Sequence, residues 1–576
     1  MQEKLTRLLV SLYGEEEGRR CAALILEAIE AARNDVRSAT PAILRQPAVS
    51  GRPFPLTEAD TVLITYGDSL VGTPDKPLVN LRRFLSEQLG GIIRGVHVLP
   101  FSPYTSDDGF SVSDYDAVNP ELGTWGDIET LASEYILMAD LVLNHCSASH
   151  PWFQGFLQQQ HPYDRYFIAA DPDTDTRDVV RPRARPLLTR FETVRGPKWV
   201  WTTFSEDQVD LNYANPEVLR AMIDVLILYL RKGVRIVRLD AVAYVWKELG
   251  TSCIHLPQTH AVVQLMRLIV QELSPEALLI TETNVPHAEN ISYFGDGANE
   301  AHMVYNFSLP PLTLDAFVTG DASILASWAT DLRLPGEGAA FFNFLSSHDG
   351  IGVQPAVDIL PSERFDGLLA AVQERGGRIS YKTTSQGDVP YELNIAFFSA
   401  IVATDVPESL RIQAFVCAHA IMCALAGVPA LYIHSLVGSH NWTTGMQQSG
   451  HNRTINRRRL DYTELVEELS DPETTRSTVL ASMLRLVETR NAHPAFSPTT
   501  SQEILESPSE LFVVGRDAQV LCIHNVSDHE VPYELPASYA DVPGPLKDLL
   551  SGAPIAPESG TRVTIEPYGV LWFSRA

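Results

Sequence analysis

Three acidic residues stand at the ends of apolar runs in this sequence. Asp240 ends the run VRIVRLD, Glu282 ends LLITE, and Asp349 ends FLSSHD. An acid at the end of a buried strand is costly unless it has a partner or a task. Three of them in one chain therefore suggest strand ends that converge on one polar pocket. The carboxyl-terminal rim of a parallel (β/α) barrel gathers chemical groups in this way.

Two of these acids could act as a pair. Cleavage of a glycosidic bond with retained configuration needs one carboxyl group as nucleophile and a second as acid and base, about 5 Å apart. Arg238 lies two residues before Asp240, on the same strand face, where it would keep that carboxylate ionised. Glu282 has no cation in its segment, so an apolar site would raise its pKa and let it donate a proton. Asp349, beside His348, would hold a sugar and favour a positively charged transition state.

Each of these pieces alone has an ordinary structural explanation. Arg238 and Asp240 could form a structural ion pair, and the TET sequence around Glu282 is common. The pair His348 and Asp349 could cap a turn or a helix. Their joint occurrence, in this order and at predicted strand ends, favours a catalytic site.

The elements that must position these acids begin at Thr61, where short apolar runs alternate with longer helical patterns, as in βα units. Eight such runs are predicted strands, and eight is the number that closes a barrel. We therefore expect an α/β fold of the (β/α)8 TIM-barrel class. The predicted strands are residues 61–66, 96–99, 136–143, 235–240, 278–282, 302–307, 341–345 and 429–433.

The chain is predicted to have three parts. Residues 1–58 show leucines at helical spacing and then a Pro-rich linker, which predicts a helical N-terminal extension. Residues 59–491 would form the catalytic barrel. Its insertions, at about 146–208 and 350–407, follow strand carboxyl ends and would overhang the pocket. Residues 492–576 contain short strand-like runs and are predicted to form a C-terminal β domain.

The bulk composition limits the classes of partner. The chain has 576 residues and a formal charge of −27, which repels nucleic acid and anionic lipid. No uncharged run is long enough to span a membrane, and the charged start of the sequence has no apolar signal core. The six cysteines form no CxxC pair and no zinc-like spacing, so we interpret them as reduced. These features favour a cytoplasmic protein.

Four motifs make the chain similar to the α-amylase family of retaining glycoside enzymes. Residues 140–145 (DLVLNH) resemble the first motif of the family and residues 233–241 the second. Glu282 with its neighbours resembles the third, and residues 344–349 the fourth. The order and context of all four match. The resemblance covers roughly residues 60–576 and implies the barrel, both insertions and the terminal β domain.

Within the family, the chain is similar to the sucrose phosphorylase group. The resemblance implies that Asp240 is the nucleophile, Glu282 the acid and base, and Asp349 the stabiliser of the transition state. It also implies a set of residues that bind the glucosyl unit, in which Phe110 and Tyr244 would form an aromatic platform. The other members of that set are Asp107, His145, Arg238, His348 and Arg453. The segments that carry the resemblance are residues 103–110, 240–244, 247–253, 308–312 and 451–457.

The resemblance further implies a double displacement. Asp240 would attack the anomeric carbon while Glu282 protonates the leaving oxygen, and phosphate would then replace water, giving α-glucose 1-phosphate. Phosphate needs cations in an acidic protein, and the Arg-Pro-Arg pattern of the family indicates Arg181 or Arg183. A solvated basic loop is the ordinary alternative. The remaining candidates in the same insertion are Arg185 and Arg190.

Several departures from plain sucrose phosphorylases bear on the leaving group. They are the N-terminal extension, Glu392 at a position where the sucrose enzymes are expected to have Gln, and residues 281–287 and 295–305. These features resemble the glucosylglycerate phosphorylases of the group and imply 2-O-α-glucosylglycerate as the substrate. Its carboxylate would need a cation or an imidazole, which His287, His434 or the arginine loop could supply. Glu392 could equally be a surface carboxylate.

Other functions stay open on the sequence. A sucrose or sucrose 6′-phosphate phosphorylase would use the same chemistry with another leaving group, and a hydrolase or transglucosidase would use another acceptor. A non-catalytic protein on this fold would typically lose the acids, which this chain retains. The expected partners are a small α-glucoside and inorganic phosphate, and a homodimer is one open arrangement. No cofactor and no metal are expected, because Asn144 could supply one calcium ligand but no acid cluster surrounds it.

Overall fold

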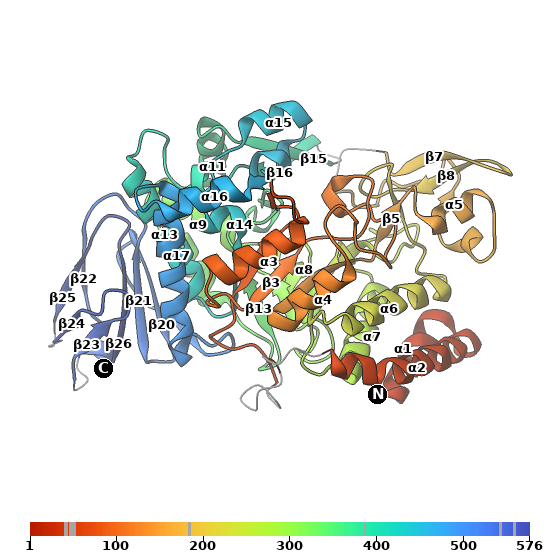
Figure 1. The fold of residues 1–576 in the computed structure, drawn as a ribbon, viewed down its shortest axis with the longest axis horizontal. Helices are drawn as coiled ribbons and strands as arrows, with labels where there is room; N and C mark the ends of the chain where they lie inside the picture. Colours follow the sequence, from red (N-terminus) through yellow and green to blue (C-terminus); the bar gives the residue numbers. More distant parts are fainter. Residues whose placement is uncertain are drawn as a thin grey trace.

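Eight parallel strands close into a barrel at the centre of the molecule (Figure 1). The computed structural model describes residues 1–39, 44, 53–182, 186–384, 387–540, 544–556 and 560–575. All eight predicted strands are present, and the predicted TIM barrel is confirmed. Around the barrel the order is β1, β17, β13, β12, β11, β10, β4 and β3. Their bounds are β1 (Val62–Thr65), β3 (Gly95–Val98), β4 (Ile136–Val142), β10 (Ile236–Asp240), β11 (Leu278–Thr281), β12 (Met303–Tyr305), β13 (Ala340–Asn343) and β17 (Val428–Tyr432).

Alternate residues of a strand point to the same side, so every second residue of each barrel strand faces the barrel interior. The inward-facing residues of β4 include Met138 and Asp140, and those of β10 are Ile236, Arg238 and Asp240. The register places Met138 beside Ile236 and Asp140 beside Arg238. The barrel interior is therefore apolar at the amino-terminal ends of these strands and charged at their carboxyl-terminal ends.

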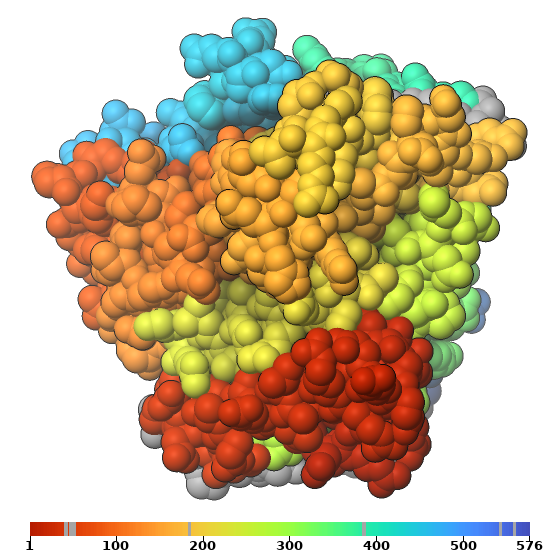
Figure 2. All heavy atoms as spheres, turned by 90° about the vertical axis from the view of Figure 1, so that its right-hand side faces the viewer, coloured from red at the N-terminus to blue at the C-terminus, as the bar shows by residue number. Residues whose placement is uncertain are grey.

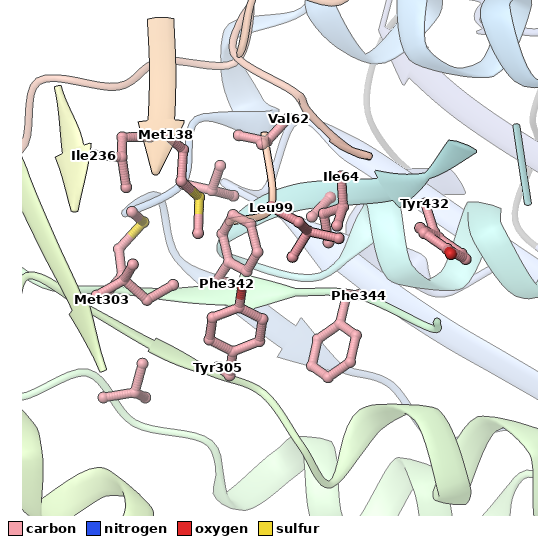
Figure 3. Close-up of a cluster of buried hydrophobic side chains, with 14 of the residues drawn as sticks. Val62, Ile64, Leu99, Met138, Ile236, Met303, Tyr305, Phe342, Phe344 and Tyr432 are labelled. Atoms are coloured by element: carbon pink, nitrogen blue, oxygen red, sulfur yellow. The ribbon is translucent and has the colours of Figure 1, made fainter. Parts of the chain in front are cut away.

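Apolar side chains fill the lower interior. Figure 3 shows Met138, Ile236 and Met303 reaching into the same space from three strands, next to the rings of Tyr305 and Phe342. The Tyr305 and Phe342 rings meet edge to face, with 4.9 Å between centroids. These apolar side chains pack the barrel interior below the polar carboxyl ends of the strands.

Helices surround the barrel, as expected for βα units. Helix α6 leads into the strand that carries Asp240, and its start is fixed by a cap: the Asn215 side chain accepts a hydrogen bond from the Glu217 backbone, with Pro216 in the first turn. The helices of this region are α3 (Pro77–Gln88), α4 (Trp125–Glu134), α6 (Pro216–Arg231), α7 (Pro257–Leu273), α8 (His287–Ile291), α9 (Leu309–Thr319), α10 (Ser323–Asp331), α13 (Glu408–Ala424), α14 (Ile433–Leu436), α15 (Thr443–Ser449), α16 (Tyr462–Ser470) and α17 (Thr475–Asn491).

Two long connections follow the carboxyl ends of β4 and β13. In Figure 1 they lie at the upper side of the barrel, with β7 and β8 in one and β15 and β16 in the other. The first contains β5 (His145–Ser147), α5 (Pro151–Leu157), β6 (Ala169–Ala170), β7 (Leu188–Thr193), β8 (Gly196–Trp201) and β9 (Gln208–Asp210). The second contains β14 (Ile351–Gly352), α11 (Ser362–Glu374), β15 (Arg378–Thr384), β16 (Gly387–Asn394) and α12 (Phe397–Ala400).

The N-terminal helices α1 (Gln2–Tyr13) and α2 (Glu15–Ser38) form a hairpin that packs on α6 and α7. Figure 2 shows this hairpin in red, against the yellow-green surface of the barrel helices. Two hydrogen bonds join it to the segments before α6 and β10: the Tyr13 hydroxyl donates to the Tyr213 carbonyl at 2.9 Å, and Arg235 donates to the Val36 carbonyl at 2.9 Å. The extension is thus packed on the outer helices of the barrel.

The C-terminal region contains two antiparallel sheets. One has six strands in the order β19, β20, β21, β26, β23 and β24, and the other pairs β22 with β25. Alternate residues of β20 face opposite sides, because Phe512 packs in the main core and Leu511 in a separate cluster. The bounds are β19 (Gln502–Ile504), β20 (Leu511–Arg516), β21 (Val520–Asn525), β22 (Val531–Glu534), α18 (Ala537–Ala540), β23 (Leu546–Asp548), β24 (Pro554–Ile555), β25 (Arg562–Ile565) and β26 (Val570–Arg575).

Across the described ranges, no helix is both long and apolar enough to cross a membrane. The division of the chain at residues 58/59 and 491/492 stays a prediction.

Candidate active site

A pocket lies where the barrel strands end. Asp240 is the last residue of β10, Glu282 directly follows β11, and Asp349 lies in the segment after β13. All three acids line this pocket. Ten of the thirteen predicted site residues line it: Asp107, Phe110, His145, Arg238, Asp240, Tyr244, Glu282, His348, Asp349 and Arg453.

Of the other three predicted residues, Glu392 and Arg181 are described and are not among the lining residues. Glu392 is buried behind Arg453, which stands between it and Asp349. Arg181 is next to Pro182, which lines the pocket. Arg183 lies outside the described residues, as does the further candidate Arg185.

The remaining candidates do not line the pocket. Arg190 is exposed on β7 and pairs with Glu192 at 2.7 Å. The His287 ring packs near Phe341, with 6.2 Å between centroids. His434 is buried, and its Nδ1 lies 3.0 Å from the Ser439 hydroxyl.

Several lining residues were not predicted. Three of them directly follow Glu282, and Tyr391 directly precedes Glu392, so proximity to the predicted residues was the signal that could have found them. Gln208 and Phe204 lie at the end of the first insertion, where no periodic pattern indicates which side chains turn inward. The unpredicted lining residues are Pro182, Phe204, Gln208, Ala241, Ala243, Thr283, Asn284, Val285 and Tyr391.

Arg238 is the central cation of the pocket floor. Its Nη1 donates to Asp240 Oδ1 at 2.6 Å, and its Nη2 lies 3.8 Å from Glu282 Oε2. The guanidinium is enclosed between two rings, 5.7 Å from the centre of Phe110 and 5.5 Å from that of Tyr305. Its buried charge therefore acts on both carboxyl groups, and more closely on Asp240.

The two carboxyl groups hold their proton unusually strongly. Burial raises the pKa of Asp240 to about 8, against the opposing effect of Arg238, and it raises the pKa of Glu282 as well. Each carboxylate also disfavours ionisation of the other, so the pair shares one proton near neutral pH. Arg238 is 2.6 Å from Asp240 and 3.8 Å from Glu282, so it favours the ionised form of Asp240 more than that of Glu282. Glu282 is also less isolated than expected, since the Ala241 backbone donates to it at 3.2 Å.

Asp349 is a permanently ionised carboxylate. Burial acts to raise its pKa, but Arg453, His348 and Arg457 outweigh burial and hold the pKa well below its usual range. Arg453 Nη1 lies 2.6 Å from Asp349 Oδ1, and Arg457 lies 3.7 Å from the same oxygen. Arg453 is in turn paired with Glu392 at 3.0 Å. The two arginines therefore hold the Asp349 carboxylate in position and favour its ionised form.

The two pocket histidines are neutral. Burial lowers the pKa of His145 to about 4 and that of His348 to about 3. The His348 ring stacks on Phe110, with 5.0 Å between centroids and 8° between planes. Tyr244 meets Phe204 edge to face at 5.4 Å. Neutral imidazoles beside aromatic faces suit hydroxyl groups and C–H surfaces of a sugar.

A lysine occupies the polar space beside His145. Lys247 Nζ donates to Asn144 Oδ1 at 2.6 Å and lies 2.8 Å from Asp210 Oδ2. The Asn144 amide lies 3.1 Å from His145 Nδ1. Asn144 thus holds the strand-end loop by hydrogen bonds. In the described ranges, no three His, Cys, Asp or Glu side chains gather closely enough to hold a metal ion.

This arrangement suits displacement at an electrophilic carbon. Asp240 is the carboxyl group closer to Arg238, Glu282 has a raised pKa that suits a proton donor, and Asp349 has a lowered pKa that suits stabilisation of a cationic transition state.

Comparison with known proteins gives four similarities. Residues 88–335 match the alpha amylase catalytic domain. The glucosylglycerate phosphorylase of Spirochaeta thermophila is 49% identical, over 99% of this chain and 98% of that protein. That of Escherichia coli is 43% identical, over 89% and 92%. The fold is similar to that of the sucrose 6F-phosphate phosphorylase from Thermoanaerobacter thermosaccharolyticum, with a TM-score of 0.72 at 24% identity, over 82% of this chain and 95% of that one.

Proposed function

Because this chain belongs to the α-amylase family, in the group of its glucosylglycerate phosphorylase relatives, we propose that it is a retaining glycoside phosphorylase acting on 2-O-α-glucosylglycerate. It is thus a glycosyltransferase that moves a glucosyl unit to phosphate. The observation that carries the proposal is that Asp240, Glu282 and Asp349 line one pocket in a chain with such relatives.

The first step forms a glucosyl-enzyme. A carboxylate oxygen of Asp240 attacks the anomeric carbon, and the bond from that carbon to the glycerate oxygen breaks. The proton of Glu282 passes to the departing oxygen, so that glycerate leaves with its hydroxyl group restored. The product is a β-glucosyl ester on Asp240, with Glu282 now ionised.

The second step transfers the glucosyl unit to phosphate. A phosphate oxygen attacks the anomeric carbon, and the ester bond to Asp240 breaks. Glu282 accepts the proton that the attacking phosphate oxygen gives up, and it is thereby ready for another cycle. Two inversions give α-glucose 1-phosphate, with the configuration of the substrate retained.

The surrounding residues act on the sugar. We assign Asp107, His145, His348 and Arg453 to the hydroxyl groups of the glucosyl unit, and Phe110 and Tyr244 to its apolar faces, because all six line the pocket. Asp349 stabilises the positive charge that develops on the ring as the leaving group departs.

Anionic phosphate and glycerate need cations at the mouth of the pocket. Arg181 is the described candidate, because its neighbour Pro182 lines the pocket and the first insertion crosses this side of the barrel. Arg183 shares the proposed role on the basis of the sequence pattern alone.

We also propose that the enzyme works in the cytoplasm, without a cofactor. All six cysteines are free and buried, which suits a reducing compartment. A homodimer is the proposed assembly to test by light scattering.

One assay series decides the function. Glucosylglycerate, sucrose and sucrose 6′-phosphate are each incubated with and without phosphate, and glucose 1-phosphate and free glucose are measured. The proposal expects phosphate-dependent release of α-glucose 1-phosphate, fastest from glucosylglycerate. Equal sugar release without phosphate, with no glucose 1-phosphate, would establish a hydrolase, and a preference for either sucrose substrate would reassign the leaving group.

A further inference from the structure

A series of three buried contacts leads from His97 on β3 to Asp240 on β10, two strands away. His97 Nε2 lies 2.7 Å from Asp140 Oδ2, and the other oxygen of Asp140 accepts from Arg238 Nη1 at 2.5 Å. The same Nη1 donates to Asp240 Oδ1 at 2.6 Å. One guanidinium nitrogen is thus shared between two carboxylates, and His97 holds one of them.

The register of the barrel strands fixes this series of contacts. His97 is on β3, Asp140 on β4 and Arg238 on β10, and these three strands are consecutive neighbours. Arg238 and Asp140 are directly paired across two strands, and His97 is level with Met138, two residues before Asp140 on the same face. The three side chains are almost wholly buried, with exposures of 0%, 0% and 2%. Water therefore competes little for their hydrogen bonds.

The proton on His97 can be placed. Asp140 is ionised: burial acts to raise its pKa, but His97 and Arg238 outweigh it and hold the pKa below its usual value. An ionised carboxylate only accepts, so His97 Nε2 must be the donor. Its buried Nδ1 has no hydrogen-bond partner in the described structure. The ring therefore makes its hydrogen bond through Nε2.

Few other titratable groups surround this series of contacts. Asp140 faces His348 from the pocket side and the phenols of Tyr229 and Tyr305. Asp240 faces Glu282 and Asp140, and the Tyr115 phenol senses its charge. Arg238 is the one cation in direct contact with either carboxylate among the described residues. How it divides its charge between them decides how well the nucleophile is held.

We propose that His97 is a positioning residue for the displacement, which acts through Asp140 and Arg238 on Asp240. The inference rests on the proposed role of Asp240 as nucleophile. His97 donates a hydrogen bond to Asp140 and so meets part of the hydrogen-bonding capacity of that carboxylate. Arg238 then stays available to keep Asp240 ionised and oriented toward the anomeric carbon.

The proposal predicts opposite effects at two positions. In a His97→Asn variant the shorter side chain no longer reaches Asp140, which then draws Arg238 more strongly, so Asp240 takes up a proton at higher pH. In an Asp140→Asn variant Arg238 serves Asp240 alone, so Asp240 stays ionised to lower pH. His97→Gln keeps an N–H donor at nearly the same reach and should resemble the unchanged enzyme.

The readout is the acid limb of kcat/KM for α-glucosyl fluoride. Fluoride leaves without protonation, so the limb reports ionisation of Asp240 in the free enzyme rather than Glu282. We expect the limb to move up by roughly one pH unit in His97→Asn and down by roughly one unit in Asp140→Asn, the size of a typical neighbouring-charge effect. Exposed His529 gives the matched control His529→Asn, which should leave the limb in place.

The outcomes separate positioning from structural support. A uniform loss of rate with an unmoved limb, or limbs that move in the same direction in both variants, overturns the proposal. If His97→Asn does not fold, Asp140→Asn and His97→Gln decide the matter, and an unmoved limb in Asp140→Asn overturns it. Because fluoride release needs only the nucleophile, a failure to phosphorolyse glucosylglycerate would overturn the proposed function without affecting this test.

Discussion

At the scale of single residues, two carboxyl groups of the same chemistry take different roles because one guanidinium lies closer to one of them. Arg238 is 2.6 Å from Asp240 and 3.8 Å from Glu282. This asymmetry favours ionisation of Asp240 over that of Glu282, and in the proposed mechanism the two groups serve as nucleophile and acid.

This separation predicts different losses for two substitutions. Asp240→Asn removes the attacking oxygen, and turnover of both glucosylglycerate and α-glucosyl fluoride should fall by roughly 10⁴-fold or more. Glu282→Gln removes only the proton donor. It should lower kcat/KM for glucosylglycerate by roughly 10²- to 10⁴-fold and kcat/KM for the fluoride much less, because the step that releases fluoride needs no proton.

Initial rates with both substrates check this prediction. Asp366→Asn, at an exposed position on α11, is the matched control and should keep full activity. Equal losses on the two substrates in Glu282→Gln would show that Glu282 is not the acid.

Glu392 is a predicted substrate-binding residue that does not line the pocket. The sequence suggested a contact with the substrate, but the carboxylate accepts from the Gly350 backbone at 2.6 Å and pairs with Arg453 at 3.0 Å. Arg453 in turn holds Asp349. Glu392 therefore supports the sugar side of the site from behind.

Glu392→Gln should lower kcat/KM by about tenfold for glucosylglycerate and α-glucosyl fluoride alike, since a charged hydrogen bond of about 1.5–3 kcal/mol is weakened behind Arg453. The exposed Glu374→Gln is the control. A loss confined to glucosylglycerate would instead assign Glu392 to the leaving group.

The sequence could place the acids but not every residue around them. Asp240, Glu282 and Asp349 were predictable because strand ends of a barrel converge whatever the loops do. Tyr391 and Gln208 were not, because they come from the insertions, where neither periodicity nor turn signals specify which side chain faces the pocket. Their placement depends on tertiary contacts, such as the pairing of β14 with β16 next to Tyr391.

At the scale of elements, the eight strands were predictable from their short apolar runs and the longer helical patterns between them. All eight fall within two residues of the predicted bounds, because strands buried on both faces read as continuous apolar runs. The N-terminal helices were predictable as helices, since their apolar positions repeat at helical spacing. How they pack was not, because an apolar stripe does not identify the surface that covers it.

The packing of α2 on α6 predicts that the extension contributes to stability. Ile25 is fully buried on α2, so Ile25→Ala should lower the free energy of unfolding by about 3 kcal/mol through lost burial and the cavity left behind. Urea unfolding followed by fluorescence measures this change. Glu27→Ala, on the exposed face of the same helix, should stay within about 0.5 kcal/mol of the unchanged protein. Equal stability of the two variants would mean that the extension is only loosely attached.

At the scale of the whole molecule, the formal charge of −27 opposes the approach of phosphate. The pocket itself adds acids, and its central cations, Arg238 and Arg453, are already paired with carboxylates. A long-range repulsion thus acts on phosphate before any local arginine can bind it.

Moderate salt should therefore speed the reaction with phosphate. Raising KCl from about 10 mM to about 150 mM shortens the Debye length from roughly 30 Å to roughly 8 Å, which screens the distant surface charge more than the buried pairs. We expect kcat/KM for phosphate to rise about two- to threefold, while that for neutral α-glucosyl fluoride stays constant. Steady-state rates at fixed pH measure both quantities. A fall in kcat/KM for phosphate with salt would instead mean that a local cationic patch that includes Arg181 attracts phosphate more strongly than the net negative charge of the protein repels it.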